Sequence, residues 1–375
     1  MKSSRRLAAV ITMTVATVAS GALATTASAS AGPAFIGPLH HTRVVASTVP
    51  ANGDVNPYGM AMVKQNEGAL VKGDVLVSNF NSVKNTQGTG TSIVQVSPKG
   101  KVSVFAQISA SSLPGSCPGG VGLTTALGIL GDGWVVVGSL PTTNGMAATA
   151  KAGCLIVLNN QGKVAETFSG EDAGIDGPWD MAVVNHGPLS ELFVTNVMKG
   201  TVAAKGKVVD NGTVQRLILL VGPTQPPQLI NSTTIASGFP QRTDPAALVI
   251  GATGLALAKS GTLYVANSLK SSISAIPGAA WRPTSAGTGT KLTSGGSLNT
   301  PLGLTMAPNG DVLTVNGGNG LIVETNPSGM QVAKKMLDSS GSPPGSGALF
   351  GLVVAPHGAG LYYVDDAVNT VRLLH

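Results

Sequence analysis

Short apolar segments separated by turn residues recur along most of the chain. Six of them contain a glycine or an aspartate near the middle: NPYGMAMV (56–63), GGVGLTTAL (119–127), GPWDMAVV (177–184), GATGLALA (251–258), TPLGLTMA (300–307) and LFGLVVA (349–355). Each is followed by a turn and a second apolar segment, such as TLYVAN or DVLTVN, and then by a third. Short runs rich in Val, Leu and Thr and bounded by Gly, Pro and Asn predict β-strands.

The repetition of this unit predicts the fold class. The units follow one another at roughly fifty to seventy residues, and most contain a fourth strand such as KVSVFA. Six four-stranded units predict an all-β, six-bladed β-propeller over residues 41–375. Only three strands fit after residue 349, and the missing outer strand is available as HTRVVAST (41–48). Pairing this N-terminal strand with the last blade would close the ring and protect a sheet edge.

The first residues form a targeting segment. Lys2, Arg5 and Arg6 precede an apolar run at 7–24, and ASA at 27–29 supplies small residues. This order predicts a secretory signal peptide over residues 1–29, cleaved after Ala29, and therefore a secreted protein. An uncleaved membrane anchor is the alternative; no other stretch is long and apolar enough to span a bilayer. Residues 30–40 are expected to be a flexible N-terminal segment.

The net charge limits the classes of binding partner, and the cysteine content predicts a disulfide. The formal net charge of +6 falls to about +3 once the three basic residues of the signal peptide are removed. The chain has no Lys/Arg cluster and only 4% aromatic residues, which disfavours nucleic-acid binding. We expect a monomer. Cys117 and Cys154 are the only cysteines, and in an exported protein they predict a disulfide, with metal binding or thiol chemistry the weaker interpretation.

The connections predict a functional face. Links that follow the second strands and links that precede the first strands emerge on the same side of a propeller, and several are long, for example NFNSVKNTQGTGTS (79–92). We call this side the long-loop face, and expect a binding surface there. The second strands reach it with a polar ring: Asn79, Ser139, Asn196, Asn267, Asn316 and Asp366. These residues are also typical corner formers that bond the local backbone. Trp179, beside Asp180, is interpreted either as a ligand contact or as packing between blades.

One segment carries a family resemblance. PLGLTMAPNGDVLTVNGGNGLIVETNPSGMQV (301–332) resembles the NHL-type repeat of six-bladed propellers, a family that includes streptogramin lyase-like and gluconolactonase-like proteins. The resemblance extends from about residue 41 to the end. It implies a divalent cation, most simply calcium, at the mouth of the central channel. Carboxylate and amide oxygens would hold it, and the matching residues here are Asp180, Asn196, Asn267 and Asp366.

Two functions follow from these observations. The first is an exported binding module that holds a small molecule, a glycan or a partner protein on the long-loop face. The alternative is a metal-dependent hydrolase or lactonase in which Asp180, Asn267 and Asp366 surround the ion and a bound water is the nucleophile. Its general base would come from Glu171, Asp172 or Asp176. His186 and His357 lie in turns on the opposite face, so the sequence does not predict the acid–base histidine chemistry that the resemblance to lyases implies.

Overall fold

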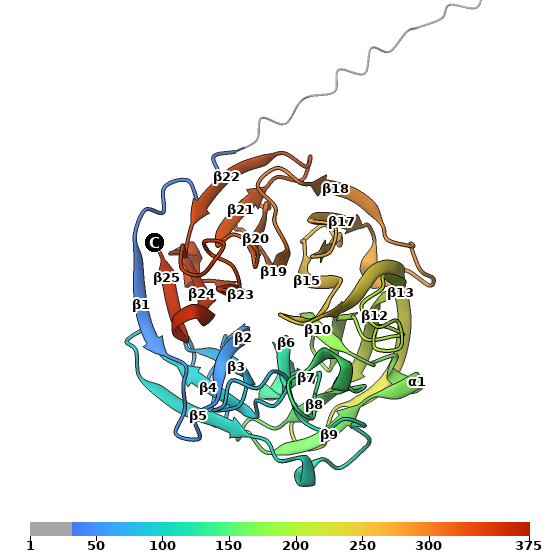
Figure 1. The fold of residues 1–375 in the computed structure, drawn as a ribbon. Coiled ribbons are helices and arrows are strands. Elements are labelled where there is room, and N and C mark those ends of the chain that lie inside the picture. The colour runs from blue at the N-terminus through green and yellow to red at the C-terminus, as the bar shows by residue number, and fades with distance from the viewer. Residues whose placement is uncertain (1–31) are drawn as a thin grey trace, which may run out of the picture. The chain divides into compact units, whose positions relative to one another are not determined.

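Six β-sheets are arranged as blades around a central channel (Figure 1). The computed structural model describes residues 32–375, so the expected signal peptide lies outside the described residues. The six-bladed propeller predicted from the repeats is confirmed. Within residues 32–375, no helix has the length and apolar character needed to cross a bilayer.

The blades follow the chain in order. Blade one contains β2 (Val55–Met62), β3 (Val75–Asn81), β4 (Ser92–Val96) and β5 (Val102–Gln107). Blade two contains β6 (Leu123–Ile129), β7 (Val135–Ser139), β8 (Cys154–Leu158) and β9 (Val164–Phe168). Blade three contains β10 (Pro178–His186), β11 (Leu189–Asn196), β12 (Val209–Leu220), β13 (Gln228–Asp244) and β14 (Leu248–Ile250).

The second half of the ring is more regular. Blade four contains β15 (Ala252–Leu257), β16 (Leu263–Asn267), β17 (Ser272–Ile276) and β18 (Thr290–Ser294). Blade five contains β19 (Pro301–Met306), β20 (Val312–Asn316), β21 (Leu321–Thr325) and β22 (Gln331–Met336). Blade six contains β23 (Leu349–Val354), β24 (Leu361–Asp365), β25 (Thr370–Leu374) and the N-terminal β1 (Thr42–Ser47). The short helices are α1 (Gly170–Ala173), η1 (Ala110–Ser112), η2 (Gly131–Gly133), η3 (Ala147–Thr149), η4 (Ala279–Trp281), η5 (Pro356–Gly358) and η6 (Asp366–Val368).

The ring closes as the sequence predicts. β1 pairs with β25 in antiparallel register from Thr42↔Leu374 to Ser47↔Thr370, so the first described strand completes the last blade. This pairing joins the two ends of the propeller chain by backbone hydrogen bonds and removes a free edge from β25. The Cys117–Cys154 disulfide is also present, with a Cα–Cα distance of 5.2 Å, and ties the loop before β6 to the start of β8.

The innermost strands share a register shift that defines one layer of the channel. The shift falls within β2, β6, β10, β15, β19 and β23. At the shift, the inner strand skips one or more residues in its pairing with the second strand of the blade. In five blades the last residue before pairing resumes is Gly59, Asp180, Gly254, Gly303 or Gly351. In blade two this position is Ala126 and not Gly122, which the sequence pattern had aligned with it. We call these six residues the anchor layer.

Close backbone contact explains the glycines of the anchor layer. A Cβ at Gly59 would lie 2.7 Å from the carbonyl oxygen of Thr125 in the next blade. A Cβ at Gly303 would overlap the carbonyl oxygen of Phe350, again in the next blade. Real Cβ atoms do not approach oxygen this closely, so the backbones of neighbouring inner strands meet only where a side chain is missing.

Blade three departs from the expected pattern. The segment 237–254 reads as a long connecting loop, but its first part extends β13 and its last part forms β14, which pairs back with Arg242↔Ile250 and Asp244↔Leu248. Two prolines and several polar residues hide this hairpin from a search for alternating apolar residues. The hairpin brings Leu248 and Val249, both fully buried, to the long-loop end of the channel.

The segment before β1 packs against the propeller. The backbone N–H groups of Phe35 and Ile36, within the segment 30–40 that the sequence predicts to be flexible, donate to the two carboxylate oxygens of Glu324, at 2.7 and 2.8 Å. The Ile36 side chain is fully buried between blades five and six. This segment is held by a single buried isoleucine and by a carboxylate from a distant strand. No local periodic pattern in the sequence therefore predicts that it is ordered.

Candidate functional site

The long-loop end of the channel is closed by apolar side chains. Tyr58, Trp179, Leu302 and Phe350 directly precede anchor-layer residues and are buried together with Leu248 and Val249. The Tyr58 ring stacks on Phe350 with centroids 4.0 Å apart and lies 6.5 Å from the Trp179 ring. Tyr58 and Trp179 belong to blades one and three, which are not neighbours, so this contact spans the channel. We call this group the plug. Trp179 is a packing residue of the plug in this structure.

The polar ring holds the corners of the blades together. Five of its members are buried and pair with residues at or near the start of the inner strands: Asn79, Ser139, Asn196, Asn267 and Asn316. The Asn79 amide donates to Thr48 O at 2.9 Å, and Asn316 donates to Ser297 O at 2.7 Å. In blade six the equivalent register position is Asp365, which forms a 2.8 Å ion pair with Arg372.

Asp366 lies one residue beyond that register position. It begins η6 and is half-buried. Burial raises the pKa of Asp366 to about 7; the polar side chain of Asn56 opposes the rise and the charge of Asp365 adds to it. The carboxylate in turn adds to the raised pKa of Tyr58, which burial dominates. Asp366 therefore faces the plug from the long-loop side.

The four residues predicted to hold a cation have separate local partners. Asn196 donates to Gly174 O and accepts from the N–H groups of Asp176 and Gly177. Asn267 donates to Pro240 O and accepts from Lys270 N. Within residues 32–375, no three His, Cys, Asp or Glu side chains gather in a way that suits a metal. As arranged here, a divalent ion would have to displace backbone partners of these oxygens, so the set does not fit a formed metal site.

Two of the three candidates for a general base have described side chains. Asp172 is exposed in α1, and the side chain of Glu171 is outside the described part of the structure. Asp176 is half-buried, and burial raises its pKa while the charge of Lys199 opposes the rise.

The open cavity lies at the other end of the channel. It has a volume of about 690 Å³ and is bounded by the second halves of the inner strands and by the residues that follow β2 and β6. These segments lead into the short turns, so the cavity opens on the face opposite to the long loops; we call it the short-turn face. The plug forms its closed end. The sequence predicts a site on the long-loop face, whereas the cavity lies at the opposite mouth of the channel.

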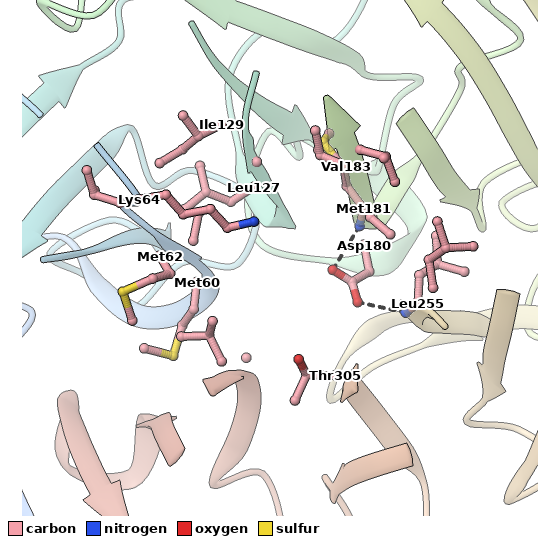
Figure 2. A pocket seen from close by; sticks show the side chains of 18 of the residues that line it. Met60, Met62, Lys64, Leu127, Ile129, Asp180, Met181, Val183, Leu255 and Thr305 are labelled. Atoms are coloured by element: carbon pink, nitrogen blue, oxygen red, sulfur yellow. Dashed lines mark hydrogen bonds between the residues drawn. The ribbon is translucent and has the colours of Figure 1, made fainter. Parts of the chain in front are cut away.

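Most of the residues that line the cavity have apolar side chains, while polar atoms make up about half of its exposed surface. Figure 2 shows Met60 and Met62 from β2, Leu127 and Ile129 from β6, and Met181 and Val183 from β10 around the cavity. Met306 and Leu352 add to the wall from blades five and six. Methionine is flexible and polarisable, so such a wall adapts to apolar molecules of different shape.

Asp180 is the only carboxylate of the anchor layer, and it lies in this cavity. Its two oxygens accept hydrogen bonds from Met181 N at 2.8 Å and from Leu255 N of the next blade at 2.9 Å (Figure 2). Its own N–H donates to Thr195 Oγ1, which donates to Thr253 O and so joins the same two blades. Burial raises the pKa of Asp180 to about 7, although the two backbone N–H groups oppose the rise.

Six other polar side chains line the cavity: Lys64, Gln65, Glu67, Thr125, Asn185 and Thr305. Thr125 is buried and its Oγ1 has no hydrogen-bond partner. Thr305 turns its hydroxyl toward the cavity, and Lys64 extends its amino group from the exposed rim (Figure 2). Glu67 is the remaining titratable residue of the lining. Sequence reasoning singled out Asp180 but missed the methionines and Lys64. The alternation of Met60, Met62 and Lys64 at the end of one inner strand was the available signal.

Comparisons with known proteins concern the fold. No family model matches the chain, and no curated protein matches it. A gluconolactonase from Xanthomonas campestris, XC5397, has a similar structure with a TM-score of 0.54 and 13% identity, over 88% of each chain. The calcium-binding protein regucalcin from Agrobacterium tumefaciens aligns with a TM-score of 0.53 and 12% identity, over 89% of this chain and 93% of its own. The PQQ-bound aldose sugar dehydrogenase of Streptomyces coelicolor gives 0.52 and 16%, over 89% and 97%. The shared property is the propeller fold.

Proposed function

We propose that this protein is an exported binding module that holds an apolar small molecule in the central channel, entering from the short-turn face. The observation that carries the proposal is the cavity of about 690 Å³, half of whose lining residues are methionine, leucine or valine. Small-molecule sites in proteins are concave, mostly apolar and of this size, with few polar groups.

The hydrogen bonds of the polar ring favour a ligand site on the short-turn face over one on the long-loop face. The ring amides are occupied by backbone partners on the long-loop side, where the plug leaves no opening next to them. On the short-turn side the wall side chains Met62, Ile129 and Val183 are half-buried and accessible from the cavity. An apolar ligand that covers them gains about 25 cal/mol for each Å² removed from water.

Binding of the neutral dye Nile red tests this function. We expect one dye site whose fluorescence is lost in Met62→Trp, because the indole would project into the cavity and narrow it. Val83→Trp is the matched control, since Val83 is exposed in the loop after β3 on the long-loop face. Dye binding that survives Met62→Trp, or that is lost in Val83→Trp, would place the ligand elsewhere and overturn the proposal. Export is tested separately by N-terminal sequencing of the secreted protein, with Ser30 as the expected first residue.

A metal-dependent lactonase is the second candidate. The carboxylate of Asp180 in the channel and the fold shared with a gluconolactonase and with calcium-binding regucalcin favour it. If a divalent ion binds in the cavity, Asp180 is the carboxylate that would hold it, because Asp366 lies on the long-loop side of the plug. The ion would supply Lewis-acid activation of a bound water. Asn196 and Asn267 would contribute only by releasing their backbone partners.

Elemental analysis of the purified protein distinguishes the two candidates. The lactonase proposal expects about one equivalent of calcium or another divalent ion, lost in the Asp180→Gly, Asp366→Asn double variant. Glycine is the appropriate replacement at 180, because four other blades carry it in the anchor layer. A wild-type protein that remains free of metal after incubation with calcium, magnesium, manganese and zinc would exclude this candidate and leave the binding module unaffected.

A further inference from the structure

The charge distribution inside the cavity is one-sided. Three titratable residues line it: Asp180, Lys64 and Glu67. Lys64 is exposed and Glu67 is half-buried, both in the segment that follows β2 at the rim. Asp180 is only 8% exposed and lies in the anchor layer beside the plug. The closed end of the cavity therefore carries one acidic group, and no basic side chain lies with it.

The carboxylate of Asp180 has unused capacity. Two oxygens offer about four lone-pair directions, and the structure fills two of them, with Met181 N and Leu255 N. Thr125 Oγ1, buried in the same cavity, has no partner at all. Each oxygen of Asp180 can still accept one further hydrogen bond, so the carboxylate offers acceptors to a ligand that donates hydrogen bonds.

We propose that the channel ligand is a hydrophobic molecule carrying one ammonium group, which pairs with Asp180 while its apolar part lies against Met60, Met62 and Met181. This inference rests on the proposed function and names the class of ligand. A neutral ligand would leave the carboxylate unpaired in a medium of low dielectric constant, and an anionic head placed at the closed end would be repelled. An ammonium group supplies both the opposite charge and several N–H donors.

Lys64 defines the competing orientation. An amphiphile with a carboxylate head would leave its head at the rim beside Lys64 and place its tail against Asp180. The rim is exposed to water and salt, which weaken an ion pair there, whereas a pair at the closed end is screened much less. The buried carboxylate therefore dominates head-group selection.

Three octyl compounds that share a tail test the inference. Octylammonium, 1-octanol and octanoate are titrated against bound Nile red at pH 7.5 on wild type, Asp180→Gly, Asp180→Asn and Asp210→Asn. We expect octylammonium to displace the dye at a concentration at least tenfold below that of octanol. In both Asp180 variants this ratio falls to near one. Asp210→Asn removes an exposed carboxylate outside the cavity lining and should keep the tenfold ratio. Asp180→Asn retains the side-chain volume if the glycine variant does not fold.

The outcomes separate this inference from the proposed function. If octanol and octylammonium displace the dye equally, or if octanoate displaces it best and does so through Lys64, the cationic ligand is overturned while the channel site stands. If neither the dye nor any octyl compound binds the wild type, as checked by calorimetry, both proposals fail. A tenfold preference that persists in Asp180→Gly would also overturn the assignment of the ammonium to Asp180.

Discussion

The carboxylate of Asp180 in blade three accepts a 2.9 Å hydrogen bond from the backbone N–H of Leu255 in blade four. At the equivalent position of blade five, Gly303 presses its backbone against the carbonyl oxygen of Phe350 in blade six. Both arrangements join neighbouring inner strands in the anchor layer. The glycine does so by having no side chain, and the aspartate by reaching across with one. Only the second solution places a charged group in the channel.

The anchor-layer glycines predict a strong sensitivity to a single methyl group. Gly303→Ala would drive a Cβ into the Phe350 carbonyl, and since both groups belong to backbones, neither moves aside cheaply. We expect a loss of at least about 3 kcal/mol in the free energy of unfolding. Gly310→Ala is the control: its φ of +91° is strained for alanine, but a Cβ there meets no atom within 4 Å. That strain costs about 1–2 kcal/mol. Urea unfolding of the two variants measures both values, and equal losses would contradict the anchor-layer argument.

The plug predicts the environment of the tryptophans. Trp134 and Trp179 are each about 5% exposed, whereas Trp281 is 76% exposed in η4. We expect acrylamide to quench one tryptophan of three readily in the native protein. Trp281→Phe should remove this accessible fraction, while Trp179→Phe should leave it in place. Efficient quenching that is retained in Trp281→Phe would show that the plug admits solvent.

The fold was predictable because its signals are local and repeated. Each blade contributes a strand with a small anchor residue, a turn, and a second strand ending in a polar residue. Because the unit occurs six times, a blade with a weak pattern can be assigned by comparison with the others. Blade two shows the limit: Gly122 fits the repeated pattern, yet Ala126 occupies the anchor layer, because β6 has a longer irregular stretch between Leu123 and Leu127. A one-dimensional pattern does not reveal which residue of an irregular strand lies against the next blade.

The site was harder to predict because it depends on long-range contacts. Asp180 was identifiable as the one carboxylate in a row of glycines. Nothing near it in the sequence indicates that its neighbour Trp179 contacts Tyr58, which lies 122 positions before Asp180, across the channel. That contact and the β13–β14 hairpin close the long-loop mouth. The polar ring looked like a set of free ligands, although its amides had already been used to hold loop backbones, which is the other role of such corner residues.

Asp311 interacts with Glu324, the carboxylate that holds the N-terminal segment, and its raised pKa predicts that stability depends on pH. Burial raises the pKa of Asp311 to about 6, and the hydrogen bond to Glu324 and the charge of Glu324 add to the rise, while Asn309 opposes it. Because the folded-state pKa lies above the unfolded value of 3.8, the protonated Asp311 contributes stability that is fully present below about pH 4. This contribution is lost as the pH rises through about 6.

Asp311→Asn isolates that contribution. The amide mimics the protonated carboxyl at every pH, so the stability of wild type relative to the variant should decrease from pH 4 to pH 7. Melting temperatures at half-unit intervals measure the difference, with Asp210→Asn at an exposed position as the control. A difference between wild type and Asp311→Asn that stays constant across this range would show that folding does not raise the pKa of Asp311.

The disulfide predicts a large stabilisation that is independent of the channel. Cys117 and Cys154 are separated by 37 positions, and the chain-entropy treatment of such a loop gives about 4 kcal/mol. We expect Cys117→Ser, Cys154→Ser to lower the free energy of unfolding by that amount. Because Cys154 is fully buried among Leu123, Ile156 and Leu158, its serine adds a desolvation penalty. Reduction of the wild type with dithiothreitol separates the two contributions, since it opens the bond without changing the side chains. Nile red binding should persist in reduced protein that remains folded, because neither cysteine lines the cavity.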